Sequence, residues 1–306
     1  MINFYGMKKN PSDHGIMRRT LIDAHSDRLL RVSTNHILLQ PHPRLRRQIA
    51  YYTILFPDHG AGRSFNLIPD ASGCLTIRIN ASSLKSCYWG PVSQIRRMCG
   101  NAGNNDFQIL VELRPGGGYF LLGTPMNLLH NAVFPLDVID KCLDRDIQRA
   151  FEKSGCSIPV FIDLLDCIFL SQMEKRKECL PVRYLTERII ASSGNVRINS
   201  LASIIGYTER HISRLCAEYV GLSPKQIARI IRINAACHVM RQTSVRSLTE
   251  LAHLLGFFDQ AHFIHEFKAV CRVSPSVYTK NMSEFYNDEP KFFPVTKGKQ
   301  SVSHII

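Results

Sequence analysis

The chain has 306 residues, of which 45% are apolar and 21% are charged, and its formal net charge is +13. This composition predicts a substantial core and leaves room for about two domains. No apolar run approaches the roughly 18 residues that a membrane helix needs, and residues 1–20 lack the apolar stretch of a signal peptide. We therefore expect a cytoplasmic protein with no membrane segment.

Residues 1–48 are polar and basic. Helical spacing is present from Arg18 to Val32, and its apolar face would hold Leu21, Ile22, His25 and Leu29. Several arginines of this segment could touch DNA, but we interpret them as a solvated arm: Arg18, Arg19, Arg44, Arg46 and Arg47. We treat residues 1–48 as a basic N-terminal extension and assign it no function.

Residues 49–173 predict a strand-rich sensor or dimerisation domain that closes with helices. Strand patterns cover Tyr51–Phe56, Cys74–Ile79 and Phe107–Leu113, with turn-forming residues between them. Helical spacing then covers Leu136–Phe151 and, roughly, Pro159–Met173. These helices are expected to complete the core of this domain or to pair with a second subunit.

The segment from Arg114 to Gly118 is rich in glycine and precedes an apolar run. A phosphate cradle would have this general character, but the segment lacks the Gly-Lys-Ser/Thr ending of a P-loop and the spacing of the dinucleotide fingerprint. We interpret it as a turn from a strand to a helix. The charged run Glu174–Glu178, followed by Pro181, then predicts a linker over 174–182.

The stretch from Asn199 to Tyr278 reads as two copies of one unit. Ser200–Tyr207 aligns with Glu250–Phe257 at an offset of 50 residues, and after the turn the offset becomes 51. A short apolar helix, a glycine turn and a second periodic helix make each unit a helix-turn-helix. We therefore predict an all-α DNA-binding domain over 183–281 and a flexible tail over 282–306. The fold class is an α+β, strand-rich first domain followed by this helical one.

Capping residues mark the helix starts of the second domain. Ser223–Gln226 and Ser247–Glu250 both fit the capping box. Pro224 and Pro275 fit first helical positions, where the missing amide hydrogen costs nothing. The charge of the domain agrees with DNA binding, because residues 183–280 hold 13 Lys/Arg against six Asp/Glu while residues 51–182 hold 13 of each.

The second helix of each unit is the predicted recognition helix, which enters the major groove by its N-terminal half. In the first unit, Leu201, Ile204 and Ile205 are expected to pack beneath this helix. Its opposite face would then present side chains to bases, since Arg suits guanine, Gln suits adenine and apolar groups suit the thymine methyl. The predicted base contacts are Arg210, Ser213, Arg214, Gln260, Ala261, Ile264 and His265.

Pro224–Gln242 is predicted to be one connector helix between the units. At about 1.5 Å per residue it would span roughly 28 Å, which is comparable with the ~34 Å between successive major grooves on one DNA face. Arg229 and Arg232 could serve phosphates, and Arg232 could equally pair with backbone or a carboxylate. The predicted phosphate contacts are Thr208, His211, Lys225, Arg229, Arg232, His262 and Lys268.

His262 and His265 form a His-x-x-His pair, which would suit two ligands of a metal site. No Cys, Asp or Glu stands where it would complete the ligands. The ten cysteines are scattered and include no Cys-x-x-Cys pair, so we interpret them as buried reduced thiols. No metal and no cofactor are expected.

Four motifs carry a family resemblance. Gly221-Leu-Ser-Pro224 precedes the connector, and Gly256-Phe-Phe-Asp-Gln-Ala-His-Phe263 is followed by Phe267-Lys268 and Ser274-Pro275. In these motifs residues 183–280 resemble the DNA-binding domain of the AraC/XylS family of bacterial transcription regulators. A sensor-like region found in front of this domain in some members is similar to the segments around 68–70, 90–91, 114–125 and 135–136.

The chain departs from the family pattern at three positions. Arg272 replaces a glycine after the second recognition helix, where a left-handed backbone would cost about 1 kcal/mol. Phe258 replaces a small capping residue and leaves Asp259 to cap the helix or to favour its first turn through the helix dipole. Cys216 replaces a bulky aromatic residue. These departures predict that the first unit, through Arg210 and Arg214, is the firmer DNA anchor.

The resemblance implies a sequence-specific transcription regulator that is not an enzyme and whose first domain senses a signal or mediates dimer contacts. Promoter DNA is the expected partner, and RNA polymerase, a second copy of the chain and a small-molecule effector are further candidates. One alternative is an Ada-like methyl-acceptor repair protein, which would need a zinc-binding cysteine cluster ahead of the motif. Another is a DNA-binding module whose first domain senses nothing.

Overall fold

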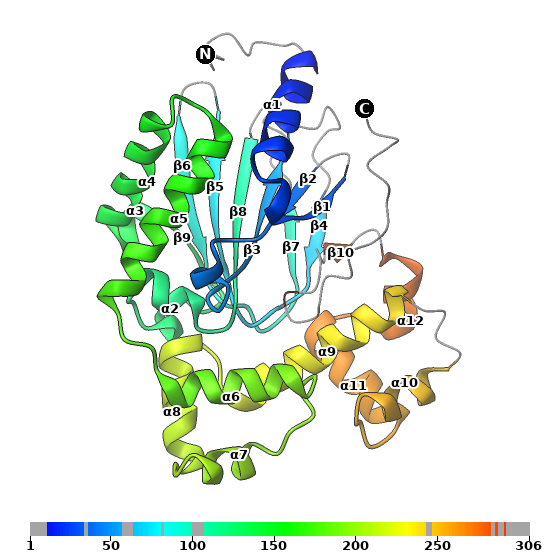
Figure 1. Ribbon diagram of the computed structural model, residues 1–306. Coiled ribbons are helices and arrows are strands. Elements are labelled where there is room, and N and C mark those ends of the chain that lie inside the picture. Colours follow the sequence, from blue (N-terminus) through cyan, green and yellow to red (C-terminus); the bar gives the residue numbers. More distant parts are fainter. Residues whose placement is uncertain are drawn as a thin grey trace.

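The computed structural model describes residues 11–33, 36–56, 64–80, 83–99, 107–242, 247–282, 285–286 and 291. A sheet with helices packed on it forms the first domain, and a group of helices beneath the sheet forms the second (Figure 1). Within the described residues, no helix combines the length and the apolar character needed to cross a membrane.

Seven strands form the main sheet, and every pair of neighbours in it is antiparallel. In spatial order they are β1 (Leu29–Val32), β2 (His36–Leu39), β3 (Ile49–Leu55), β8 (Phe107–Leu113), β5 (Cys74–Ile79), β6 (Leu84–Trp89) and β9 (Val133–Pro135). The three strands expected from the sequence are its adjacent central strands β3, β8 and β5. A second, three-stranded sheet consists of β10 (Phe285–Tyr286), β4 (Ser64–Leu67) and β7 (Arg96–Cys99).

Helices cover one face of the main sheet and share its core (Figure 1). They are α1 (Pro11–Ala24), α4 (Lys141–Lys153) and α5 (Ile158–Lys175). The alternation of β5 places Leu75, Ile77 and Ile79 in this core while the residues between them are half-buried. Short 3-10 turns at Ser26–Arg28, Pro43–Leu45 and Met126–Leu128 (η2, η3 and η4) connect the larger elements.

Residues 11–48 belong to this domain and do not form a separate extension. Met17 and Leu21 of α1 are buried in its core, and β1 and β2 add two strands to the edge of the sheet. The charge of Arg28 is compensated by the buried Asp166 at 2.6 Å. The expected helix over 18–32 is wrong beyond Ala24, because the chain turns at His25 and continues as a strand.

The glycine-rich segment connects β8 to α2 (Gly117–Leu122), as the sequence predicts. A Cβ atom on Gly117 would lie 2.3 Å from the carbonyl oxygen of Gln48, and one on Gly118 would lie 2.0 Å from the hydroxyl of Tyr88. Close packing of this turn against the sheet therefore requires the two glycines.

Two expectations about the helices before the second domain need correction. The helix expected over 136–151 is two helices, α3 (Leu136–Ile139) and α4, because Asp140 leaves the helical conformation and caps α4 through the amides of Cys142 and Leu143. The linker is shorter than 174–182. Helix α5 continues to Lys175, and α6 begins at Leu180.

The second domain consists of seven helices in the described part of the chain. They are α6 (Leu180–Ala191), α7 (Ile198–Ile204), α8 (Glu209–Val220), α9 (Pro224–Gln242), α10 (Leu248–Leu254), α11 (Gln260–Cys271) and α12 (Pro275–Lys280). Helix α9 is the expected connector, with Ile227, Ile230 and Ile231 buried. Ser223 and Gln226 form a reciprocal capping box at its start, with bonds of 3.3 and 2.9 Å.

The two domains touch along several elements. The side-chain amide of Asn234 on α9 donates to the carbonyl of Pro69 at 2.6 Å, and the amide of Ile95 donates to the carbonyl of Val270 at 3.0 Å. Lys291, beyond the last helix, reaches back to the acidic side chains of the first domain. The helical second domain is therefore docked on the sheet domain.

Cysteines are free thiols where the structure describes them, and their burial varies. Cys216, Cys237 and Cys271 are buried as expected. Cys142 and Cys167 are exposed, so the interpretation of all cysteines as buried thiols is wrong for these two. Both lie on outward faces of helices packed on the sheet.

Candidate nucleic-acid interface

The two units have the same local construction. Helices α7 and α8 form the first unit, and α10 and α11 form the second, with left-handed glycines in the turns at Gly206 (φ 73°) and Gly256 (φ 71°). Thr208 accepts a bond from the amide of His211 at 3.2 Å, and Asp259 accepts one from the amide of His262 at 2.7 Å. The predicted repeat and the capping role of Asp259 are thus confirmed.

Each recognition helix rests on an apolar face of its own unit. In the first unit Ile212 and Cys216 are buried, and in the second unit Phe263 and Phe267 are buried. Ile204, expected beneath the recognition helix, is instead 68% exposed. The buried stripe of α7 follows positions 198, 201, 202 and 205, which leaves position 204 on the outer side.

The opposite face of α8 presents the side chains predicted to contact bases. Arg210 and Arg214 are exposed, and neither guanidinium has an ion-pair or hydrogen-bond partner among the described residues. Ser213 lies between them and is half-buried. The first unit therefore offers two unneutralised guanidinium groups in the first half of its recognition helix.

Helix α11 presents a less cationic face. Gln260, Ala261 and His265 are exposed, whereas Ile264 packs partly on the core of its unit. The carbonyl oxygen of the Gln260 side chain accepts a bond from the hydroxyl of Thr249 at 2.7 Å. Because an amide oxygen has two lone pairs, this bond holds the Gln260 side chain in place and leaves its carbonyl able to accept a second bond from adenine.

Three side chains that were predicted to contact phosphate already make contacts within the protein at the starts of the recognition helices. Thr208 caps α8, and the ring of His211 lies 4.9 Å from the ring of Tyr207. In the second unit, Nδ1 of His262 lies 3.3 Å from the amide nitrogen of Phe258, an arrangement in which this amide donates to the ring. Lys268, by contrast, is exposed and has no described partner.

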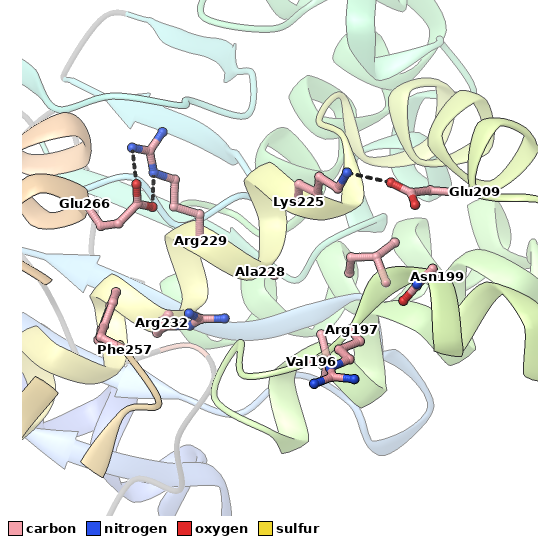
Figure 2. Close-up of a pocket in the computed structure, with 11 residues that line it drawn as sticks. Val196, Arg197, Asn199, Glu209, Lys225, Ala228, Arg229, Arg232, Phe257 and Glu266 are labelled. Atoms are coloured by element: carbon pink, nitrogen blue, oxygen red, sulfur yellow. Dashed lines mark hydrogen bonds and ion pairs between the residues drawn. The ribbon is translucent and has the colours of Figure 1, made fainter. Parts of the chain in front are cut away.

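The cations of the connector are held by residues of both units (Figure 2). Lys225 contacts Glu209 of α8 at 2.7 Å, and Arg229 pairs with Glu266 of α11 through a hydrogen bond from Nη2 at 2.9 Å and a charge contact from Nε at 2.6 Å. These side chains border a cavity of about 590 Å³ between the units. The connector is therefore tied by charge to the two recognition helices.

Arg232 has the structural role that the sequence left open. Its guanidinium donates to the carbonyl of Gly194 at 2.7 Å and lies 5.2 Å from the centre of the Phe257 ring. Burial lowers the pKa of Arg232, and Glu266 acts in the opposite direction. Arg232 thus links the end of α6, the connector and the turn of the second unit.

The backbone of Arg272 is left-handed, with φ 57° and ψ 5°, as its position after α11 predicted. Its guanidinium makes a hydrogen bond with the side-chain oxygen of Gln94 in the first domain. An arginine at this position can make that contact, whereas glycine cannot. The left-handed backbone of Arg272 could be predicted from the sequence, whereas its bond to Gln94 could not.

Glu209 and Glu266 are further residues that sequence reasoning missed. Their acidic side chains stand on the recognition helices of a basic domain, and a carboxylate in such a place is a sequence signal for a nearby cation. His265 Nδ1 lies 3.6 Å from Glu266. Among the residues described by the structure, no three His, Cys, Asp or Glu side chains are grouped as metal ligands.

Comparison with known proteins places the C-terminal region in a sequence family. Residues 201–281 match the family model described as a helix-turn-helix domain. An uncharacterized HTH-type transcriptional regulator from Haemophilus influenzae is 29% identical over 86 residues, which cover 28% of this chain and 28% of the relative. The HTH-type regulator YidL from Escherichia coli is 29% identical over 113 residues, covering 35% of this chain and 38% of the relative.

Two solved structures are also similar. ToxT from Vibrio cholerae is 16% identical with a TM-score of 0.34, and the match covers 74% of this chain and 92% of ToxT. The C-terminal domain of AraT, a response regulator from Geobacillus stearothermophilus, is 22% identical with a TM-score of 0.33, covering 37% of this chain and 93% of that domain. Because these TM-scores are low, the architecture given above follows from the contacts within this chain and not from the two similar structures.

The matched region coincides with the two units, their caps and the connector. It includes the exposed starts of α8 and α11 and excludes the sheet domain. The regulator relatives are matched over little more than a third of their length or less. Residues 201–281 are therefore similar to the helix-turn-helix domain that these transcription regulators share.

Proposed function

We propose that this protein is a sequence-specific transcription regulator that inserts α8 and α11 into successive major grooves of promoter DNA. One observation carries the proposal: two equivalent helices with exposed polar starts are joined by a single connector helix. The connector has 19 residues, so it spans about 28 Å at 1.5 Å per residue. Adjacent major grooves on one face lie ~34 Å apart, which suits one chain that contacts both.

The ion pairs of the connector support simultaneous insertion. Lys225–Glu209 and Arg229–Glu266 each join α9 to one recognition helix. Holding both helices in a set orientation lowers the conformational entropy that would be lost on binding DNA. Arg229 then acts mainly by orienting α11, and the phosphate contacts fall to side chains such as Lys268.

The first unit is the stronger anchor in this proposal. Arg210 and Arg214 have no described partners, so their guanidinium groups can pair with guanine without breaking an existing bond. Gln260 is uncharged and already accepts a bond from Thr249. The second unit would then adjust the choice of site more than it adds to affinity.

Control of DNA binding is assigned to the sheet domain, which would act in the cytoplasm through a signal or a dimer contact. The support is its direct docking on α9 and α11 at Pro69, Gln94 and Ile95. A second copy of the chain, RNA polymerase and a small effector are the candidate partners. The proposal assigns no catalytic step, and no observation favours the Ada-like alternative.

Binding-site selection from a random duplex library tests the proposal. We expect the full chain to enrich one sequence with two half-sites about 10 base pairs apart. Arg214→Ala and Gln260→Ala should each relax preference at one base pair, at a cost of about 1–3 kcal/mol on the selected site. Arg149→Ala, an exposed change on α4, is the matched control. If no sequence is enriched after repeated rounds of selection, the proposal is wrong.

A further inference from the structure

A cleft of about 830 Å³ lies between the two domains, on the side of the first helix-turn-helix unit. The first domain contributes η3, the residues after it and the turn into α2. The second domain contributes α6 and the end of α8, and the connection between α5 and α6 closes one side. Figure 1 shows α2 directly above α8 at this junction. We call this space the interdomain cleft.

Four arginines of the first domain line the cleft without an acidic partner. Arg44, Arg46 and Arg47 are exposed and Arg114 is half-buried, and none of them forms an ion pair within the described residues. The Nε of Arg114 donates to the backbone carbonyl of Arg46 at 3.0 Å. Burial lowers the pKa of Arg114, since its charge is partly removed from water.

Two further arginines of the cleft already have partners, whereas the exposed Lys177 has none among the described residues. Arg183 contacts Glu178 at 2.6 Å, and Arg176 donates to the carbonyls of Phe120 and Leu121 at 2.8 Å each. Four of the five unpartnered cations are therefore the arginines of one wall, and the carboxylates of the cleft, Glu178 and Glu187, lie beside Arg183 instead. A concentration of guanidinium groups without carboxylates is suited to an anion with more than one negative charge.

Aromatic rings form another part of the lining. Tyr119 of α2 and Tyr219 of α8 come from different domains, and their ring centres lie 4.2 Å apart with the planes tilted by 40°. Phe120 lies beside them, and Val182 and Ile190 of α6 add apolar surface. These side chains offer faces for a flat ring next to the arginine wall.

We propose that the interdomain cleft binds a small phosphorylated aromatic molecule, of the class of nucleoside phosphates. Phosphate oxygens would pair with the guanidinium groups of Arg46 and Arg114, and the ring would lie against Tyr119 and Tyr219. The volume falls in the range of about 300–1,000 Å³ that small-molecule sites occupy. A carboxylate with a long alkyl chain carries one negative charge, so it would neutralise one arginine of this wall and leave the other three unpaired.

A ligand in this position would contact both domains at once. Tyr219 belongs to α8, so binding would favour one placement of the first recognition helix relative to the sheet domain. This consequence for DNA rests on the proposed function. Ligand binding in the cleft does not rest on the proposed function, and ligand binding and DNA binding are measured separately.

The first experiment titrates ADP, AMP, adenosine, inorganic phosphate and octanoate into the full chain by calorimetry. We expect saturable ADP binding that is at least tenfold tighter than binding of adenosine, phosphate or octanoate. Arg46→Gln with Arg114→Gln should weaken ADP binding at least tenfold, and Arg149→Gln on α4 should leave it unchanged. If thermal unfolding shows that the double variant does not fold, the single variants Arg44→Gln and Arg46→Gln, both at exposed residues, replace it in the binding test.

Several results would overturn the site. These are no binding of ADP or AMP, nucleotide binding that the arginine changes leave unaltered, and octanoate binding more tightly than the nucleotides. The second experiment measures affinity for the selected DNA with and without ADP. A change that disappears in the Arg46→Gln variant supports coupling, whereas an unchanged affinity overturns coupling alone. Failure of the proposed function appears differently, as a lack of any selected DNA alongside intact ADP binding.

Discussion

Arg229 and Glu266 form an ion pair that joins the first third of the connector helix to the second recognition helix, with a hydrogen bond of 2.9 Å from Nη2 and a charge contact of 2.6 Å from Nε. Arg229 is 36% exposed and Glu266 is 22% exposed, so water weakens their attraction only in part. The pair gives Arg229 a partner inside the protein at the position where phosphate contact was predicted.

A charge exchange separates these two roles of Arg229. We expect Arg229→Glu to lower both DNA affinity and stability, the latter by about 1 kcal/mol for a partly exposed pair. The double variant Arg229→Glu with Glu266→Arg should recover most of both, because the attraction is restored with reversed sign. Equilibrium unfolding and DNA titration measure the two effects. Affinity that stays low in the folded double variant would assign Arg229 to phosphate.

Arg272 combines backbone strain with a contact to the first domain. Replacing it by glycine should relieve the left-handed strain and stabilise the protein by about 0.5–1 kcal/mol, while the lost bond to Gln94 would cost a similar amount. In the Gln94→Ala background the bond is already absent, so Arg272→Gly should be more stabilising there than in the natural chain. A double-mutant cycle of urea unfolding measures this difference. Equal effects in both backgrounds would show that the contact contributes nothing.

Lys268 is expected to contact DNA phosphate and to read no base. Each phosphate contact changes the slope of log K against log salt by roughly −0.9. Lys268→Ala should therefore make the slope shallower by about 1 while the selected sequence stays the same. Filter or fluorescence binding at several salt concentrations provides the slope, with Lys141→Ala on α4 as the control. Identical slopes for Lys268→Ala and the natural chain would contradict the assignment.

Lys291 is a buried cation held by the first domain. Its side chain contacts Asp70 and lies 2.7 Å from Glu112, and both Lys291 and Glu112 are 8% exposed. Lys291→Met should destabilise the protein by about 3–5 kcal/mol, because it leaves buried carboxylates without a counter-charge. Urea unfolding measures the loss, and Lys280→Met on the surface of α12 is the control. A loss no larger than that of the control would show that the contact does not stabilise the fold.

The contribution of Lys291 should also depend on pH in one direction. Burial alone would lower its pKa, but Asp70 and Glu112 outweigh burial and raise the pKa above the ordinary 10.5. Because the folded pKa is the higher one, the stabilisation is complete below pH 10.5 and is lost as pH rises through the folded value. The stability difference between the natural chain and Lys291→Met should therefore be constant from about pH 7 to 9. A difference that shrinks within this window would contradict the raised pKa.

The C-terminal domain could be predicted in detail because its signals are local. Ser223, Asp259 and Ser274 cap helices within three residues of themselves, and the apolar spacing of α8 and α11 sets their exposed faces. The exposure of Arg210 and Arg214 follows from that spacing. The pairing of Arg229 with Glu266 does not, since it joins residues 37 positions apart through the packing of two helices.

The first domain was harder to predict because its elements depend on distant partners. Strands β1 and β2 have four residues each and lie among basic residues, so they carry too little periodicity to stand out. β10 pairs with β4 in parallel across more than 200 residues. The interdomain cleft is likewise invisible in the sequence, because Arg46, Arg114 and Tyr219 approach one another only when both domains are folded and docked.

The position of Lys291 along the chain has a consequence for biosynthesis. Lys291 follows Asp70 by 221 residues, so at about 5–20 residues per second the ribosome adds it roughly 10–40 s later. Throughout that interval the nascent sheet domain holds Asp70 and Glu112 without their counter-charge. A premature stop between α12 and Lys291 would therefore spare every helix of the DNA-binding domain and still weaken the domain that was made first.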